Sequence, residues 1–123
     1  MPLHATADIE EGNLVVRPVG IARFLSLRSK IVTPVRAITS VTTEPDFKAV
    51  RGEVRGARWG GSSFPGLVHA GRFGWKKPSF LLVGRHRPLV AVRSPGAQFE
   101  LQLFYAEDPH GVARKIERAI TRT

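Results

Sequence analysis

Cysteine is absent from this 123-residue chain. Its absence excludes disulfide bonds, thiolate metal sites and catalysis by a thiol nucleophile. Long apolar runs are absent as well, because the longest, residues 80–83, is as short as one strand and far below the ~20 residues of a membrane-spanning helix. The first residues show no basic start followed by an apolar stretch, which is the pattern of a secretion signal. We therefore expect a cytoplasmic protein.

Residues that commonly catalyse reactions or bind metals are few and scattered. The four histidines do not stand at metal-ligand spacing, and no two acids stand out as a working pair. Ser62 and Ser63 follow two glycines, but no nucleophile elbow and no phosphate-binding loop motif accompanies them. Glycine and serine are ordinary turn residues, so a turn is predicted there. The sequence predicts no enzyme, no cofactor and no metal site.

Acidic residues are in short supply relative to basic ones. Nineteen Lys and Arg against ten Asp and Glu give a net charge of +9 and a pI near 11.3. A charge of this size is typical of proteins that bind nucleic acid or anionic membranes. Fourteen of the nineteen are arginines scattered along the chain, and a GC-rich genome tends to produce the same usage. The charge is therefore compatible with a functional basic face and with a compositional bias.

Short β-type segments fill most of the chain, from about residue 7 to residue 106. Residues 7–10 and 14–17 predict a hairpin, with a turn at 11–13 because Gly and Asn tolerate a positive φ. Pro34 can donate no ladder hydrogen bond, so a strand edge or a turn is expected there. The further predicted strands are residues 21–28, 31–32, 35–44, 67–74, 78–84, 89–93 and 98–105.

Two of these strands, and the turn between residues 93 and 98, are predicted in enough detail to be checked residue by residue. In 35–44, Ile38 and Val41 are three positions apart, which favours a bulge or a helical turn entering the strand. Residues 94–97 combine Pro and Gly and predict a turn. Strand 98–105 alternates almost perfectly. Its expected inward residues are Phe99, Leu101, Leu103 and Tyr105, and its expected outward residues are Glu100 and Gln102.

Residues 45–65 form the irregular part of the sequence. Several glycines separate its arginines, and they argue against a helix. We expect a long ordered loop over a barrel opening. Loops of this length are uncommon inside compact domains and are often functional.

A helix is predicted over residues 108–122. Asp108 is a good N-cap, and Pro109 occupies the first helical position, where its missing N–H costs nothing. Gly111 weakens the helix slightly. The apolar stripe consists of Val112, Ala113, Ile116, Ala119 and Ile120. The basic residues off that stripe favour the last turns of the helix electrostatically; they are Arg114, Lys115, Arg118 and Arg122.

Three short stretches carry a resemblance to a known family: residues 34–41 (PVRAITSV), 58–66 (RWGGSSFPG) and 107–109 (EDP). With the strand series and the closing helix, they resemble the bacterial pleckstrin-homology-like domains found as small single-domain proteins. The resemblance implies a mostly β (α+β) fold over residues 1–123, a partly open seven-stranded β-barrel capped by one C-terminal α-helix. It also implies a binding scaffold without catalytic machinery.

Eukaryotic relatives in that family bind inositol phospholipids through Lys and Arg around the first hairpin loop. The corresponding loop here, residues 10–13, is acidic. No lipid site is therefore transferred from the resemblance.

A second candidate surface combines aromatic and basic residues: Arg55, Arg58, Trp59, Trp75, Lys76 and Lys77. Aromatic rings among cations could stack on bases, cover phosphates or enter a membrane interface. Equally, one Trp could plug a barrel end, with Arg packed on it.

Two functions follow from these observations. The first is a non-enzymatic binding or scaffolding module that contacts a protein partner or a second copy of itself through sheet edges and the 45–65 loop. The alternative is a binder of anionic surfaces that uses the basic and aromatic residues. For this alternative we rank peripheral contact with an acidic membrane above nucleic acid. No small-molecule substrate is expected.

Overall fold

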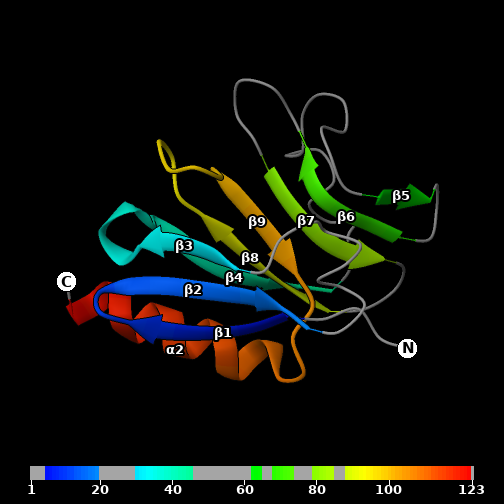
Figure 1. Cartoon of the computed structure of the whole chain (residues 1–123). Helices are drawn as coiled ribbons and strands as arrows, with labels where there is room; N and C mark the ends of the chain where they lie inside the picture. The colour runs from blue at the N-terminus through cyan, green and yellow to red at the C-terminus, as the bar shows by residue number, and fades with distance from the viewer. Residues whose placement is uncertain are drawn as a thin grey trace.

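The computed structural model of the chain is mostly β, with two sheets and a C-terminal α-helix (Figure 1). It describes residues 5–19, 30–45, 62–64, 68–73, 79–84 and 88–122. The strands within these ranges are β1 (Ala5–Glu10), β2 (Asn13–Pro18), β3 (Ile31–Pro34), β4 (Ser40–Glu44), β5 (Ser62–Phe64), β6 (Val68–Phe73), β7 (Ser79–Gly84), β8 (Leu89–Arg93) and β9 (Leu101–Phe104). The helices are the 3-10 helix η1 (Val35–Ala37) and the α-helix α2 (Pro109–Arg122).

The strands form two sheets and not a closed barrel. Sheet A has the order β1-β2-β3, and sheet B has the order β4-β8-β9-β7-β6-β5. Every neighbouring pair is antiparallel except β7 and β9, which are parallel. The expected count of seven strands is also wrong, since the described residues alone form nine. The number seven came from the resemblance. In sheet B, β9 lies between β8 and β7, a non-local pairing that no local pattern encodes.

The first hairpin is confirmed, but its turn is one residue shorter than predicted. Glu11 and Gly12 both have positive φ, at 51° and 78°, and Asn13 already belongs to β2. Two such residues make a type I′ turn, whose twist matches that of the flanking strands. Glu11 therefore adopts the backbone conformation that the sequence had suggested for Asn13.

For residues 35–44 the sequence predicted either a bulge or a helical turn at the start of the strand. The structure has the helical turn, η1. β3 ends at Pro34, and η1 follows before β4 begins at Ser40. The Val35 N–H donates to the Gly12 carbonyl at 3.0 Å, which ties η1 to the first hairpin. The chain passes from sheet A to sheet B through this turn.

Most of the 45–65 segment and the predicted strand 21–28 lie outside the described residues. Within 45–65, the prediction of a loop is wrong at β5, and so is the turn expected at Ser62 and Ser63. These two residues pair with Ala70 and His69 of β6. Backbone pairing with a neighbouring strand overrides the turn propensity of serine.

The remaining strand predictions hold in their main lines. Residues 68–73 and 79–84 form the antiparallel pair β6 and β7, and 89–93 is β8. The turn at 94–97 is confirmed, because the Ala97 N–H donates to the Ser94 carbonyl at 3.1 Å and Gly96 has a φ of 82°.

The most regular predicted strand differs from its prediction in length and in facing. β9 covers only Leu101–Phe104, and all four of its residues are buried. Gln102, expected to face water, is fully buried and donates from Nε2 to Thr33 Oγ1 of β3 at 2.8 Å. β9 has sheet neighbours on both sides, and its Gln102 face meets sheet A. Alternation alone cannot distinguish a solvent face from a face covered by a second sheet.

The helix begins as predicted. The Asp108 carbonyl accepts from the Val112 N–H, and its side-chain Oδ1 accepts from the Gly111 N–H at 3.0 Å. Gly111 has a use that the sequence did not reveal, since a Cβ there would collide with the Asp108 carboxylate. The glycine thus costs helix propensity but leaves room for the cap.

α2 packs on the core that both sheets share. Ile116 is fully buried in that core, and Val112, Ala113 and Ile120 pack against it. The helix contacts β1 at the edge of sheet A, and β4 and β8 at the edge of sheet B. Figure 1 shows it running along β1, on the side of the molecule away from β5 and β6. The predicted C-terminal helix is therefore present and covers the shared core, but it packs on two sheets and not on the end of a barrel.

Ile116→Ala should lower the free energy of unfolding by about 2–5 kcal/mol, because it removes buried methyl groups and leaves a cavity. Ile116→Asp should abolish folding, since it buries an unpaired charge. The exposed neighbour Glu117→Ala is the control and should change stability by about 0.5 kcal/mol at most. Urea unfolding followed by circular dichroism measures all three. A folded and equally stable Ile116→Asp protein would contradict this packing of α2.

Thr33→Val should lower stability by about 1–3 kcal/mol, because the buried Gln102 amide loses its hydrogen bond to the Thr33 hydroxyl. Among the described residues, Gln102 Oε1 has no partner. The double variant Thr33→Val with Gln102→Leu removes both ends of the polar pair and should recover most of the loss. A double-mutant cycle in urea tests this. Strictly additive effects would show that the two side chains do not interact.

Candidate functional site

The six residues of the predicted basic and aromatic surface all lie outside the described residues: Arg55, Arg58, Trp59, Trp75, Lys76 and Lys77. Their proposed role stays a prediction. The described residues, by contrast, include nine Lys and Arg and eight Asp and Glu, so they are almost neutral. Most of the +9 net charge therefore resides in the other parts of the sequence.

A second group of basic residues is described in full, on the outer face of α2. Arg114, Arg118 and Arg122 are four positions apart and all exposed. Residues four apart lie on the same side of an α-helix, so the three form one row. At 1.5 Å per residue, the row spans about 12 Å along the helix axis. We call these three residues the arginine row.

The side chains of this face form a shallow, open hollow. It is lined by Arg114, Glu117, Arg118, Thr121 and Arg122. The Thr121 hydroxyl donates to the Glu117 carbonyl at 2.9 Å and so serves the helix itself. Glu117 is the only acid among the five lining residues, all of which have polar or charged side chains and are exposed. The hollow is suited to an elongated anion and not to an enclosed substrate.

The arginine row has no partner within the part of the chain that the structure describes. No ion pair or side-chain hydrogen bond to Arg114, Arg118 or Arg122 occurs there. Because guanidinium groups present a rigid fork of donors, such a row can bind phosphate or carboxylate oxygens in pairs.

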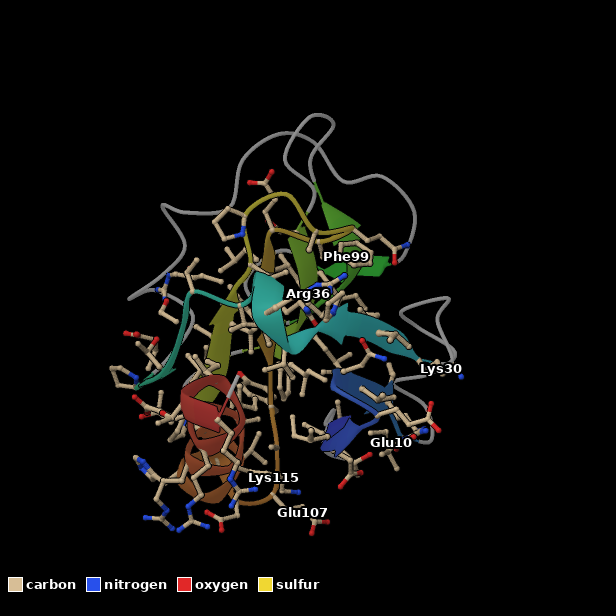
Figure 2. All side chains as sticks on the ribbon, turned by 90° about the vertical axis from the view of Figure 1, so that its left-hand side faces the viewer. Glu10, Lys30, Arg36, Phe99, Glu107 and Lys115 are labelled. Atoms are coloured by element: carbon tan, nitrogen blue, oxygen red, sulfur yellow. The ribbon has the colours of Figure 1, made fainter. Side chains whose placement is uncertain are left out.

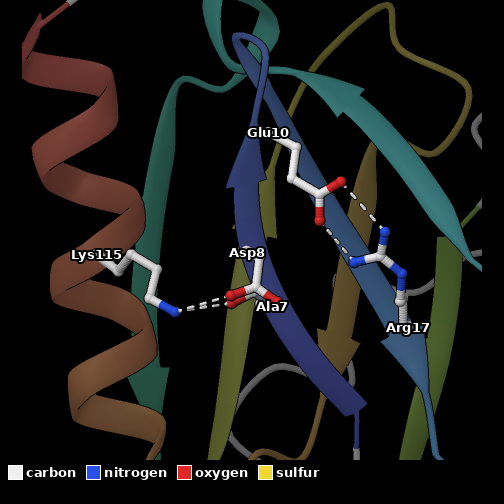
Figure 3. Close-up of polar contacts among 5 residues, drawn as sticks. All are labelled: Ala7, Asp8, Glu10, Arg17 and Lys115. Carbon is white, nitrogen blue, oxygen red and sulfur yellow. Dashed lines mark hydrogen bonds and ion pairs between the residues drawn. The ribbon is translucent and has the colours of Figure 1, made fainter.

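Lys115, the fourth basic residue of α2, has a different task. Its ammonium group donates to the Ala7 carbonyl at 3.1 Å and to Asp8 Oδ1 at 3.3 Å (Figure 3). Ala7 and Asp8 belong to β1, the edge strand of sheet A. Lys115 thus satisfies an edge carbonyl and holds the helix against the sheet, while its neighbours in the arginine row face outward.

Acidic side chains border the arginine row. Glu107 and Asp108 precede α2 and are exposed. Asp8 and Glu10 on β1 are also exposed, but they are paired with Lys115 and Arg17 (Figure 3). The positive surface is therefore narrow, about one helix side wide.

Glu10 is paired with Arg17 on the neighbouring strand. Two hydrogen bonds, of 2.8 and 3.2 Å, join the guanidinium to the carboxylate (Figure 3). These hydrogen bonds, and then the positive charges of Arg17 and Lys30, lower the pKa of Glu10, although partial desolvation opposes them. Both side chains are exposed, so the pair contributes little to stability. It neutralises the acidic end of the hairpin.

No metal-binding constellation occurs among the described residues. No three of their His, Asp and Glu side chains come close enough to hold a metal ion. His110 lies 3.5 Å from the Thr43 hydroxyl through Nδ1, a contact between α2 and β4. Within the described ranges, no helix has the length and apolar character that crossing a membrane requires.

Sequence reasoning noted the basic residues of α2 but interpreted them only as favourable charges near the helix end. The spacing of four was the signal for a row, and it was visible in the sequence. What the sequence could not show is that Lys115 is used by β1 while the other three are not. No family model, no curated protein and no solved structure matches this chain, so its function has to be inferred from the residues themselves.

Proposed function

We propose that this protein is a non-enzymatic binding module that contacts an anionic partner through the outer face of α2. The arginine row supports this proposal most directly, because three exposed guanidinium groups stand on one helix side without a partner among the described residues. Like charges four residues apart on a helix repel one another, which opposes the favourable effect of basic residues near the C-terminal end of the helix. An anion that bridges them would relieve that repulsion.

The docking of α2 supports the same proposal. Its apolar stripe is used by the core, where Ile116 is fully buried. The helix is therefore held rigidly, and its outer face is presented without any rearrangement. The backbone that carries the row is therefore fixed before binding, and only the arginine side chains lose conformational freedom when an anion binds.

The resemblance to bacterial pleckstrin-homology-like domains belongs to this proposal as well. The C-terminal helix that closes one side of a mostly β structure fits it, and a scaffold of that kind is suited to binding. The parallel pairing of β7 and β9 departs from a simple series of hairpins. The basic and aromatic residues predicted from the sequence, Arg55 to Lys77, would extend the same positive surface or form another.

Arg114→Gln with Arg118→Gln should weaken retention on immobilised heparin, a strongly anionic polymer. Each lost arginine should cost about 1 kcal/mol, the usual contribution of a basic side chain near an anionic surface. Glutamine preserves helix propensity. The matched control is Lys30→Gln with Arg36→Gln, which removes two exposed cations that lie away from the outer face of α2 in Figure 2, although η1 itself contacts the helix.

The salt concentration at elution is the measurement, and the control should elute close to the unmodified protein. Equal shifts for the two variants would mean that heparin senses only net charge. In that case the outer face of α2 is not the binding site.

A specific observation favours a second function, contact with a protein partner or a second copy at β3. This strand is an edge of sheet A as far as the structure describes it. On its outer side Val32 is 40% exposed, although its pairing partner Val15 is buried. An edge strand with an exposed apolar side chain can accept an added strand.

Val32→Lys should abolish any self-association through β3, because a lysine on an edge strand opposes the pairing of a second strand. Light scattering after size-exclusion chromatography would report the mass of each species over a range of concentrations. A protein that is monomeric at all concentrations before the substitution would eliminate the second-copy form of this function.

A further inference from the structure

The geometry of the arginine row points to a linear polyanion, and we infer that the row binds the phosphate backbone of a nucleic acid strand. This inference rests on the proposed function and narrows its partner. Three features of the described residues carry it: the shape of the positive surface, its acidic borders and the identity of its cations.

The shape of the surface is a line. Arg114, Arg118 and Arg122 follow one side of α2 over about 12 Å. A nucleic acid strand in a duplex carries one phosphate charge per 3.4 Å of its axis. Three successive guanidinium groups about 6 Å apart can therefore each reach a phosphate of the same strand.

The acidic borders make a flat anionic surface a poor fit. A bilayer laid against α2 would also approach the exposed Glu107 and Asp108 before the helix. Asp8 and Glu10 on β1 are already paired with Lys115 and Arg17 and add little net negative charge. Like charges brought together in this way repel one another. A narrow strand can follow the row and avoid these carboxylates. The apolar stripe of α2 is also buried in the core, so the helix has no apolar face to insert into a membrane.

The identity of the cations agrees with phosphate as the ligand. The outward row consists of arginines alone, while the lysine of the same helix is occupied by Ala7 and Asp8. A guanidinium fork can donate two hydrogen bonds to one phosphate, whereas an ammonium acts as a point charge. Glu117 beside the row would limit the affinity and favour partners whose charges lie along the line of arginines.

The test measures binding of a fluorescein-labelled 16-nucleotide single strand by anisotropy over a range of salt concentrations. The protein should bind, and log Kd should rise with log salt. In the triple variant Arg114→Gln, Arg118→Gln, Arg122→Gln, the slope should be smaller by about 2, because each phosphate contact on a single strand contributes about 0.7. The triple control Arg17→Gln, Lys30→Gln, Arg36→Gln removes the same charge elsewhere and should keep most of the slope.

Vesicles of phosphatidylcholine with and without one-fifth phosphatidylserine provide the second arm, measured by co-sedimentation. The inference expects the arginine row to contribute to oligonucleotide binding and not to vesicle binding. If the triple variant loses vesicle binding but binds the oligonucleotide as well as the unmodified protein does, the inference is overturned and the proposed function stands. If neither ligand depends on the row and heparin retention does not either, both are overturned. Circular dichroism confirms that each variant is folded.

Discussion

The packing of α2 between two sheet edges is the constraint on which the rest of this structure depends. β1 ends sheet A and β4 ends sheet B, and the helix contacts both. Without it, the shared core around Ile116 would be open to water at that side, and two strands would present unpaired backbone groups. The helix addresses both problems, since its apolar stripe fills the core and Lys115 binds an outward carbonyl of β1.

Local signals in the sequence were sufficient for the parts of the fold that are stabilised locally. The first hairpin depends on a two-residue turn, and α2 depends on the Asp108 cap and a regular apolar stripe. The sequence was insufficient to predict features that depend on which distant segments pair with each other. The parallel pairing of β9 with β7 and the burial of Gln102 against Thr33 both depend on which strands meet. The alternating pattern of residues 98–105 reads the same whether the second face meets water or another sheet.

The candidate site shows the same division. The sequence marks every basic residue of α2, and their spacing already predicts a row. It does not say which of them the fold uses, because Asp8 is more than a hundred residues away from Lys115 in the chain. Only the contact between α2 and β1 separates a cation that anchors the helix from three that remain outside. The predicted site at Arg55 to Lys77 lies beyond the described ranges and stays a prediction.

The basic residues described here therefore fall into two groups, those that pair with carboxylates of the fold and those that do not. Arg17 and Lys115 meet carboxylates on β1, where they steady the hairpin and the helix. The arginine row meets none among the described residues, although Glu107 and Asp108 stand exposed before α2. The favourable interaction of Arg118 and Arg122 with the helix end is opposed by the repulsion between neighbouring guanidinium groups. A row that costs repulsion and contributes no contact to the fold is best explained by a ligand whose charges follow the same line.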